Sequence, residues 1–169
     1  MSSDFPVRKD TRLRNYDYSL PGCYFITICT HDRQPLFLPF VGAHLCVRPP
    51  SDACFAVKWL YELEHKYPGV AIDCCAVMAD HIHFILSITG AHTGAPLQEM
   101  VKWYKTQTTN AYIRQVRQGT LPAYKNHVWQ RGYYDHIIRN DTDLNEIRTY
   151  IQNNPLKECD SYGQEKNVQ

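Results

Sequence analysis

The chain has 169 residues, of which 44% are hydrophobic and 21% are charged, and this is the size and composition of one soluble globular domain with its own core. The formal net charge of +1 does not by itself indicate a nucleic-acid partner, because phosphate-binding proteins usually carry a basic excess. No segment approaches the roughly 18 apolar residues of a membrane span, so we expect no membrane partner.

The cysteines point to a reducing environment. Their number, seven, is odd, they contain no Cys-x-x-Cys pair, and no apolar segment typical of a secretory signal follows Met1. We therefore expect reduced thiols and a cytoplasmic protein. Cys23, Cys29, Cys74 and Cys75 lie in strand-like runs, where we expect them to act as small apolar side chains.

The first half of the chain alternates strand and helix patterns. A β-branched and aromatic run follows the turn Pro21-Gly22 and predicts a strand over 24–30. The proline-rich segment 34–51 predicts a loop or a short hairpin. Apolar residues at helical spacing predict a helix over 53–67, which ends before Pro68-Gly69.

The middle of the chain predicts a hairpin and a long helix. Apolar runs at 70–77 and 81–89 are joined by residues 78–80 and predict two antiparallel strands. A loop over 90–96 follows. Apolar residues then repeat along one face of a helix over 97–118, at positions Leu97, Val101, Tyr104, Thr108, Tyr112 and Val116.

The last two expected elements are a strand over 129–138 and a helix over 141–152. Asn140 or Asp141 can cap this helix, and acidic residues crowd its first turn, where they favour the positive end of the helix dipole.

The order strand, helix, strand, strand, helix, strand predicts an α+β fold. We expect a ferredoxin-like or RRM-like four-stranded antiparallel sheet with helices on one face and an appended C-terminal helix. The expected organisation is a basic N-terminal arm at 1–20, a single domain over 21–160 and a C-terminal tail at 161–169.

Two histidines in the second strand of the hairpin are candidates for a metal site. His81 and His83 flank Ile82, and residues i and i+2 of a strand point to the same face, so two imidazoles lie side by side. A structural role for the pair is the alternative. A metal role requires a third ligand and a reactive group from elsewhere in the chain.

The C-terminal helix offers both. Tyr150 and Asn154 are four residues apart and share a helix face, so a phenol and a carboxamide project together. Because Asn154 precedes Pro155, we expect it at the end of the helix. The alternative is that Tyr150 packs in the core and Asn154 merely stops the helix.

Five sequence blocks occur in the order and spacing found in the single-tyrosine HUH transposases, and the chain resembles the REP-associated tyrosine transposase branch of that family. The blocks are Arg12-Leu13-Arg14, residues 24–30, residues 78–83, residues 129–139 and residues 150–155. The family usually has Met-Pro-Asn before its first histidine, where this chain has Met78-Ala79-Asp80. The change keeps both histidines and replaces a rigid turn.

The resemblance implies a metal-dependent single-stranded DNA endonuclease and strand transferase. His81 and His83, with Asn154 as third ligand, would hold Mg²⁺ or Mn²⁺. The phenol of Tyr150 would attack a phosphodiester of hairpin-bearing, REP-like single-stranded DNA and form a 5′-phosphotyrosine intermediate. The general base is not indicated, and monomer and homodimer both stay open.

The charge distribution fits such a partner. From Leu97 to Arg139 the chain has seven basic and two acidic side chains, a local net charge of +5. The residues that we expect to contact DNA are Arg8, Lys9, Arg12, Arg14, Lys102, Lys105, Arg114, Arg117, Arg131, His136 and Arg139. A solvated helix face and a solubilising N-terminal tail are the alternatives. Trp103, Tyr104, Tyr133 and Tyr134 could stack on unpaired bases, although core packing is the alternative for at least half of them.

Two other functions remain open. The chain could be a domesticated, non-transposing protein that only binds DNA hairpins, and covalent capture of DNA would separate the two. It could also be a two-histidine phosphodiesterase that acts on RNA ends. That class needs a second histidine motif with a hydroxyl residue two positions later, and His65, His92 and His127 supply no matching copy.

Overall fold

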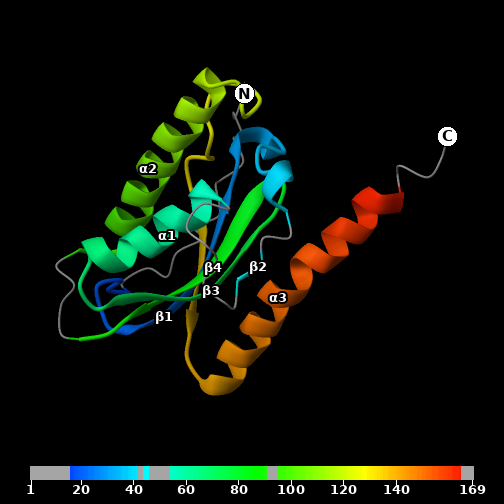
Figure 1. Cartoon of the computed structure of the whole chain (residues 1–169). Coiled ribbons are helices and arrows are strands. Elements are labelled where there is room, and N and C mark those ends of the chain that lie inside the picture. The colour runs from blue at the N-terminus through cyan, green and yellow to red at the C-terminus, as the bar shows by residue number, and fades with distance from the viewer. Residues whose placement is uncertain (1–15, 42–43, 46–53, 91–94, 165–169) are drawn as a thin grey trace, which may run out of the picture.

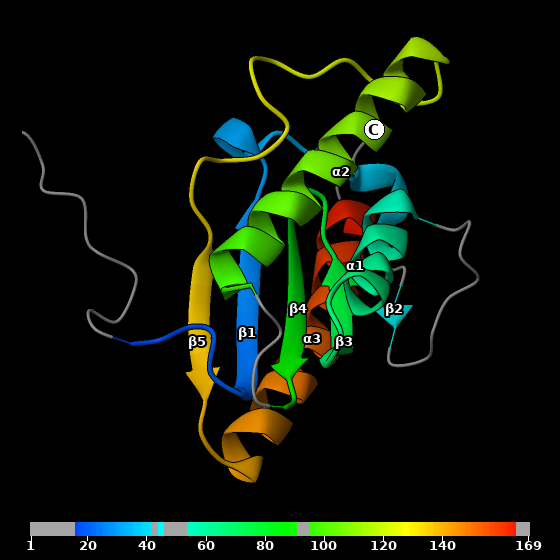
Figure 2. The ribbon, with the colours of Figure 1, turned by 90° about the vertical axis from the view of Figure 1, so that its left-hand side faces the viewer.

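The computed structural model describes residues 16–41, 44–45, 54–90 and 95–164. It has three layers, in which two helices cover one face of a β-sheet and a third helix crosses the other face (Figures 1 and 2). The helices are α1 (Phe55–Lys66), α2 (Leu97–Arg117) and α3 (Asp141–Gln164). Helices α1 and α2 lie together on one side, and α3 lies on the opposite side.

The sheet has the order β2-β3-β4-β1-β5, and all neighbouring strands are antiparallel. Its strands are β1 (Gly22–Cys29), β2 (His44–Leu45), β3 (Val70–Val77), β4 (His81–Ile88) and β5 (Tyr134–Ile138). The four longer strands and their order confirm the expected ferredoxin-like fold. The two-residue strand β2 adds a fifth strand at one edge.

The main core lies between the sheet and the α1/α2 layer. Successive side chains of β1 point to opposite faces of the sheet. Tyr24, Ile26 and Ile28 are fully buried on the face that α1 and α2 cover. The apolar face expected along α2 is buried from Leu97 to Tyr112. A smaller cluster on the other face packs beneath α3, and its members are Phe25, Cys74, Ala76, Met78, Ile85, Ile138 and Ile151.

The expected strand over 129–138 is wrong in its first half. Only Tyr134–Ile138 forms β5, and Trp129 makes a single isolated bridge with Thr30. Between them, the carbonyl oxygens of Gln130 and Gly132 accept hydrogen bonds from the Lys105 ammonium, at 2.8 and 2.7 Å. A side chain of α2 therefore takes the place of a neighbouring strand.

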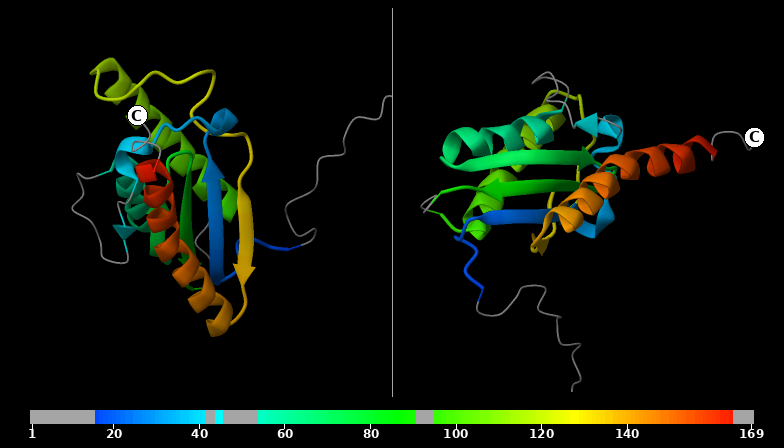
Figure 3. Two further views of the ribbon diagram at one scale, coloured as in Figure 1. Left: turned by 90° about the vertical axis from the view of Figure 1, so that its right-hand side faces the viewer. Right: turned by 90° about the horizontal axis from the view of Figure 1, so that it is seen from below.

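The expected end of the last helix is also wrong. Helix α3 continues through Pro155 to Gln164, so Asn154 lies inside it and not at its end. Pro155 removes one backbone donor, which would have bonded to the carbonyl of Ile151, and the helix tolerates this single loss. The cap is as expected, since Asn140 Oδ1 accepts a hydrogen bond from the Asp143 amide at 2.8 Å. The second half of α3 extends beyond the sheet (Figure 3).

The described part of the chain bears on two further expectations. Within it, Cys23, Cys29, Cys54, Cys74 and Cys75 are all free thiols. None of the helices described combines the length and the apolar character needed to cross a membrane.

Candidate active site

His81 and His83 lie at the start of β4, on the sheet face that α3 crosses. Their backbone partners on β1 are Cys29 and Thr27. His83 is only 4% exposed, and His81 is half-buried. The two Nε2 atoms face each other at 3.0 Å. The structure therefore brings two imidazole nitrogens to one point on a rigid strand.

The opposite nitrogen of each ring is held by a neighbouring side chain. Nδ1 of His81 lies 2.5 Å from Oδ1 of Asp80. Because a carboxylate only accepts, His81 Nδ1 donates this hydrogen bond, and the tautomer that carries its proton on Nδ1 leaves the lone pair on Nε2. Nδ1 of His83 lies 2.8 Å from the hydroxyl of Thr27, which can donate or accept.

These donors fit a divalent metal ion. Two nitrogens that are each about 2.1 Å from one ion, at right angles, are about 3.0 Å apart, which matches the Nε2 separation. Burial, with smaller contributions from His81 and Arg33, lowers the pKa of His83 to about 3, so its imidazole is neutral as a ligand must be. No cluster of three His, Cys, Asp or Glu side chains suited to a metal occurs among the described residues, so a third ligand from this part of the chain would be of another type.

The turn before His81 is anchored although it lacks the proline of the family pattern. The Asp80 carbonyl oxygen accepts hydrogen bonds from the amide and the hydroxyl of Thr30, at 2.8 and 3.0 Å. The Ala79 carbonyl oxygen accepts one from the Phe37 amide at 2.9 Å. Arg33 pairs with the Asp80 carboxylate at 3.3 Å. Interactions with the segment after β1 thus replace the stiffness of a proline.

Tyr150 lies on α3, directly beside the histidine pair. Its ring centroid is 5.4 Å from that of His83 and 6.0 Å from that of Phe25. Tyr150 is 50% exposed, so the alternative that it is a core residue is wrong. Asn154 lies one turn later on the same helix face and is half-buried.

An ion pair and apolar contacts hold α3 on the sheet. The guanidinium of Arg148 donates to both carboxylate oxygens of Asp73 on β3, at 2.8 and 2.6 Å. These hydrogen bonds raise the pKa of Arg148, so the pair stays charged. Ile151 is buried in the cluster beneath the helix. Tyr150 follows Arg148 by two residues and directly precedes Ile151, so the nucleophile candidate lies between two anchored positions.

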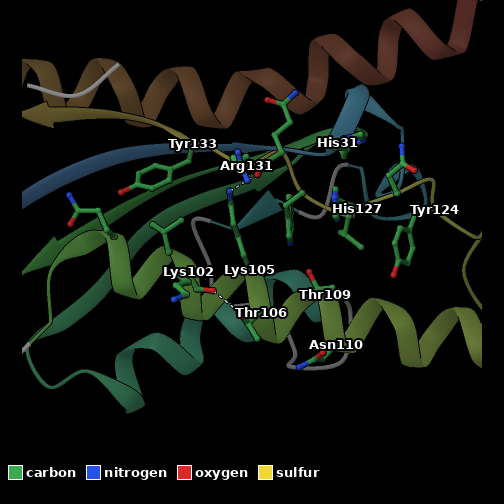
Figure 4. A pocket seen from close by; sticks show the side chains of 16 residues that line it. His31, Lys102, Lys105, Thr106, Thr109, Asn110, Tyr124, His127, Arg131 and Tyr133 are labelled. Atoms are coloured by element: carbon green, nitrogen blue, oxygen red, sulfur yellow. Dashed lines mark hydrogen bonds between the residues drawn. The ribbon is translucent and has the colours of Figure 1, made fainter. Parts of the chain in front are cut away.

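A groove of about 860 Å³ lies on the opposite face of the sheet, between α2 and residues 124–133 (Figure 4). Lys102 and Lys105 line it from α2, and Arg131 lines it from the facing segment. Tyr133 lies near the Lys105 ammonium, which is 6.0 Å from its ring centroid. Three of the basic residues expected to contact DNA are therefore brought into one concave surface.

The other expected DNA contacts lie elsewhere. Arg114 and Arg117 are exposed on the last turns of α2, outside the groove, and Arg139 is exposed just after β5. His136 Nε2 is 3.0 Å from the Asp143 carboxylate and so joins β5 to the start of α3. Arg8, Lys9, Arg12 and Arg14 lie outside the described residues.

Sequence reasoning missed several residues that shape this site. The pairing of Thr27 with His83 depends on the register between β1 and β4, which periodicity alone does not supply. Asp80 drew attention only as a departure from the family pattern, although a carboxylate next to a candidate metal-binding histidine is a common way to orient it. Phe25, Asp73 and Arg148 carried no chemical pattern in the sequence.

Comparisons with known proteins show the family to which the chain is similar. Residues 57–154 match the family model described as "Transposase IS200 like". A Haemophilus influenzae protein of uncharacterised function is 35% identical over 162 residues, covering 88% of each chain. A second protein of that organism, provisionally named a REP-associated tyrosine transposase, is 28% identical over 152 residues, covering 86% of this chain and 77% of its own.

Two solved structures share the fold. One is the REP-associated tyrosine transposase bound to a REP hairpin, with a TM-score of 0.59 and 21% identity over 86% of this chain and 73% of that chain. The other is a crystal structure provisionally described as a transposase from Deinococcus radiodurans, with a TM-score of 0.50 and 18% identity over 84% of this chain and 95% of that chain. The resemblance seen in the sequence is confirmed, and the chain belongs to the IS200-like transposase family.

Proposed function

We propose that this protein is a metal-dependent endonuclease and strand transferase that acts on single-stranded DNA carrying a hairpin. The observation that carries the proposal is the half-exposed phenol of Tyr150, which lies against His83, whose Nε2 faces that of His81. A nucleophile beside two imidazoles that can act as metal ligands suits phosphodiester chemistry.

Tyr150 is the nucleophile. Its oxygen forms a bond to the phosphorus as the bond from phosphorus to the 3′ oxygen breaks. The phenol loses its proton and the departing 3′ oxygen gains one, so the products are a 5′-phosphotyrosine and a free 3′-hydroxyl. The phosphoester is conserved, so the reverse attack by another 3′-hydroxyl joins strands without an energy source.

His81, His83 and Asn154 would hold Mg²⁺ or Mn²⁺, with the Asn154 amide oxygen as the third ligand. A bound divalent ion supplies Lewis-acid polarisation of the scissile phosphate. Asp80 and Thr27 orient the two imidazoles. Phe25 packs against both His83 and Tyr150 and keeps the nucleophile next to the ligands.

The groove beside α2 would bind the hairpin. Lys102, Lys105 and Arg131 place positive charge along it, and such contacts to phosphates are independent of sequence. The relative whose structure holds a REP hairpin supports this class of partner. Arg8, Lys9, Arg12 and Arg14 would add contacts from the N-terminal arm.

The test is covalent capture. The protein is incubated with hairpin-bearing single-stranded DNA and Mn²⁺, and the products are separated on a denaturing gel. We expect a protein–DNA adduct that is absent in Tyr150→Phe and present in Tyr134→Phe. Tyr134 is a matched control because it is also 50% exposed and its ring also contacts Phe25. Equal cleavage by wild type and Tyr150→Phe would contradict the proposal.

His81→Ala tests the role of the histidines. We expect it to abolish adduct formation and to keep most of the affinity for the hairpin, because the groove lies on the other face of the sheet. An unfolded His81→Ala protein would instead indicate a structural role for the pair.

A further inference from the structure

Two consecutive tyrosines lie at one edge of the sheet and belong to different faces. Tyr133 lines the groove beside α2. Tyr134 begins β5, the strand at the end of the sheet order, and shares the face of the histidine pair. A strand of DNA that runs from the groove past Tyr133 and around this edge of the sheet meets Tyr134 before it reaches the face of Tyr150.

The backbone register aligns Tyr134 with the candidate metal site. Thr27 on β1 is paired with Tyr134 on one side and with His83 on the other. Neighbouring strands are about 4.8 Å apart, so Tyr134 and His83 begin about 10 Å from each other on one face. That separation is on the scale of a single nucleotide.

The surroundings of Tyr134 leave its ring available. Its centroid is 6.4 Å from that of Phe25, in an edge-on arrangement, and the side chain is 50% exposed. Phe25 also contacts the rings of His83 and Tyr150. The rings of Tyr150 and Tyr134 therefore both pack against the ring of Phe25.

Of the four aromatic residues considered for base stacking, the structure favours this one. Tyr104 is fully buried, and Trp103 packs edge-on against Trp59. Tyr133 is half-buried near the Lys105 ammonium. Tyr134 alone among the four is both exposed and on the face of the histidines.

We propose that Tyr134 is a base-binding residue that stacks on an unpaired nucleobase next to the scissile phosphate as the strand crosses the β5 edge. The inference rests on the proposed function, because that function supplies the single strand and its phosphate. Stacking on an aromatic ring suits a base of any identity, so Tyr134 positions the strand without reading its sequence.

The experiment uses the full chain with Tyr150→Phe, so that no cleavage occurs. The probes are a hairpin alone and the same hairpin with a single-stranded extension that carries 2-aminopurine at one position at a time. We expect the fluorescence to be quenched at one position of the extension. The quenching should persist in Tyr134→Phe, which keeps the ring, and disappear in Tyr134→Leu, which does not.

Affinity supplies a second readout. Tyr134→Leu should weaken binding of the extended hairpin about 10-fold and leave binding of the hairpin alone unchanged. Unchanged quenching in Tyr134→Leu, or an equal loss of affinity for both probes, would overturn the inference. If Tyr134→Leu does not fold, Tyr134→Trp is used instead; its larger ring should tighten binding of the extended probe alone, and affinities equal to those of the tyrosine protein would overturn the inference.

The outcome is separable from that of the proposed function. Adduct formation by the wild-type chain tests the chemistry of Tyr150, whereas quenching is measured in protein that cannot form the adduct. An adduct without quenching at any position would reject the role of Tyr134 alone.

Discussion

Asp80 fixes which nitrogen of His81 is available to a metal ion. The carboxylate accepts from Nδ1, so Nε2 keeps its lone pair and points at His83 Nε2. Asp80→Ala removes this acceptor and frees the ring, and we expect the affinity for Mn²⁺ to fall about 10- to 100-fold. Asp80→Asn keeps an acceptor oxygen and should stay near wild type. Calorimetric titration of Mn²⁺ into the full chain measures the effect.

The control for Asp80 is another partly buried carboxylate. The side chain of Asp73 is 27% exposed and that of Asp80 is 25% exposed, but Asp73 lies on β3 and pairs with Arg148 of α3. Asp73→Asn leaves the His81 contact intact and should lower the Mn²⁺ affinity much less than Asp80→Ala does. An affinity for Mn²⁺ that is the same in Asp80→Ala and in wild type would show that the contact does not orient the ligand.

The hydroxyl of Thr27 forms a hydrogen bond with the buried Nδ1 of His83. Thr27→Val keeps the shape of the side chain but leaves His83 Nδ1 without its partner at a site that is 4% exposed. An unsatisfied buried polar atom costs about 1–3 kcal/mol, so the free energy of unfolding should fall by that amount. Thr27→Ser keeps the hydroxyl and should lose less. Urea denaturation of the three proteins measures the difference, and equal stability of Thr27→Val and wild type would contradict it.

The start of helix α3 could be predicted from the sequence, but its end could not. Its start was predictable because Asn140 and the acidic first turn are local features, and the antiparallel pairing of β3 with β4 was predictable from two apolar runs joined by a short turn. Its end was not, because the rule that helices stop before proline is a local preference, and α3 continues through Pro155. Likewise, β5 is shorter than the strand expected over 129–138, because Lys105 of the distant helix α2 donates hydrogen bonds to the carbonyl oxygens of Gln130 and Gly132.

The ion pair between Asp73 and Arg148 joins β3 to α3 close to Tyr150. Its effect on the position of the helix can be tested by mutation. Arg148→Gln removes the positive charge and the bidentate hydrogen bonds to Asp73. The partners are 27% and 38% exposed, so the free energy of unfolding should change by less than about 1 kcal/mol. Displacement of a nucleophile by about 1 Å can cost about 100-fold in rate, and we expect adduct formation to slow about 10- to 100-fold.

Rates of adduct formation at saturating Mn²⁺ and DNA measure this effect. Hairpin affinity should not change, because the groove contacts do not involve Arg148. The exchanged pair Asp73→Arg with Arg148→Asp should recover part of the rate. A rate for Arg148→Gln equal to that of the wild type would mean that apolar packing alone positions α3.

At the scale of the whole molecule, the sheet separates two surfaces. The candidate catalytic groups lie on the sheet face that α3 crosses, and the basic groove lies beside α2 (Figure 4). This division explains why a net charge of +1 is compatible with a DNA partner, because the positive residues Lys102, Lys105 and Arg131 are gathered on one side. The sequence indicated their excess, whereas only the fold could bring Arg131 opposite α2.

Because the groove and the candidate catalytic site lie on different faces of the sheet, we expect the salt dependence of hairpin binding to be independent of DNA cleavage. Each phosphate contact that is removed lowers the slope of log affinity against log salt by about 1. Lys102→Ala and Arg131→Ala should each weaken hairpin binding and reduce this slope, whatever the hairpin sequence.

Lys58→Ala, which removes an exposed charge of α1 outside the groove, should change neither the affinity nor the slope. Binding measured from about 50 to 200 mM salt gives the slopes, and a slope for Lys102→Ala equal to that of Lys58→Ala would place the hairpin elsewhere. Addition of EDTA should leave all these slopes unchanged, because the histidine pair lies beside Tyr150 of α3, whereas the groove is lined by α2 and residues 124–133.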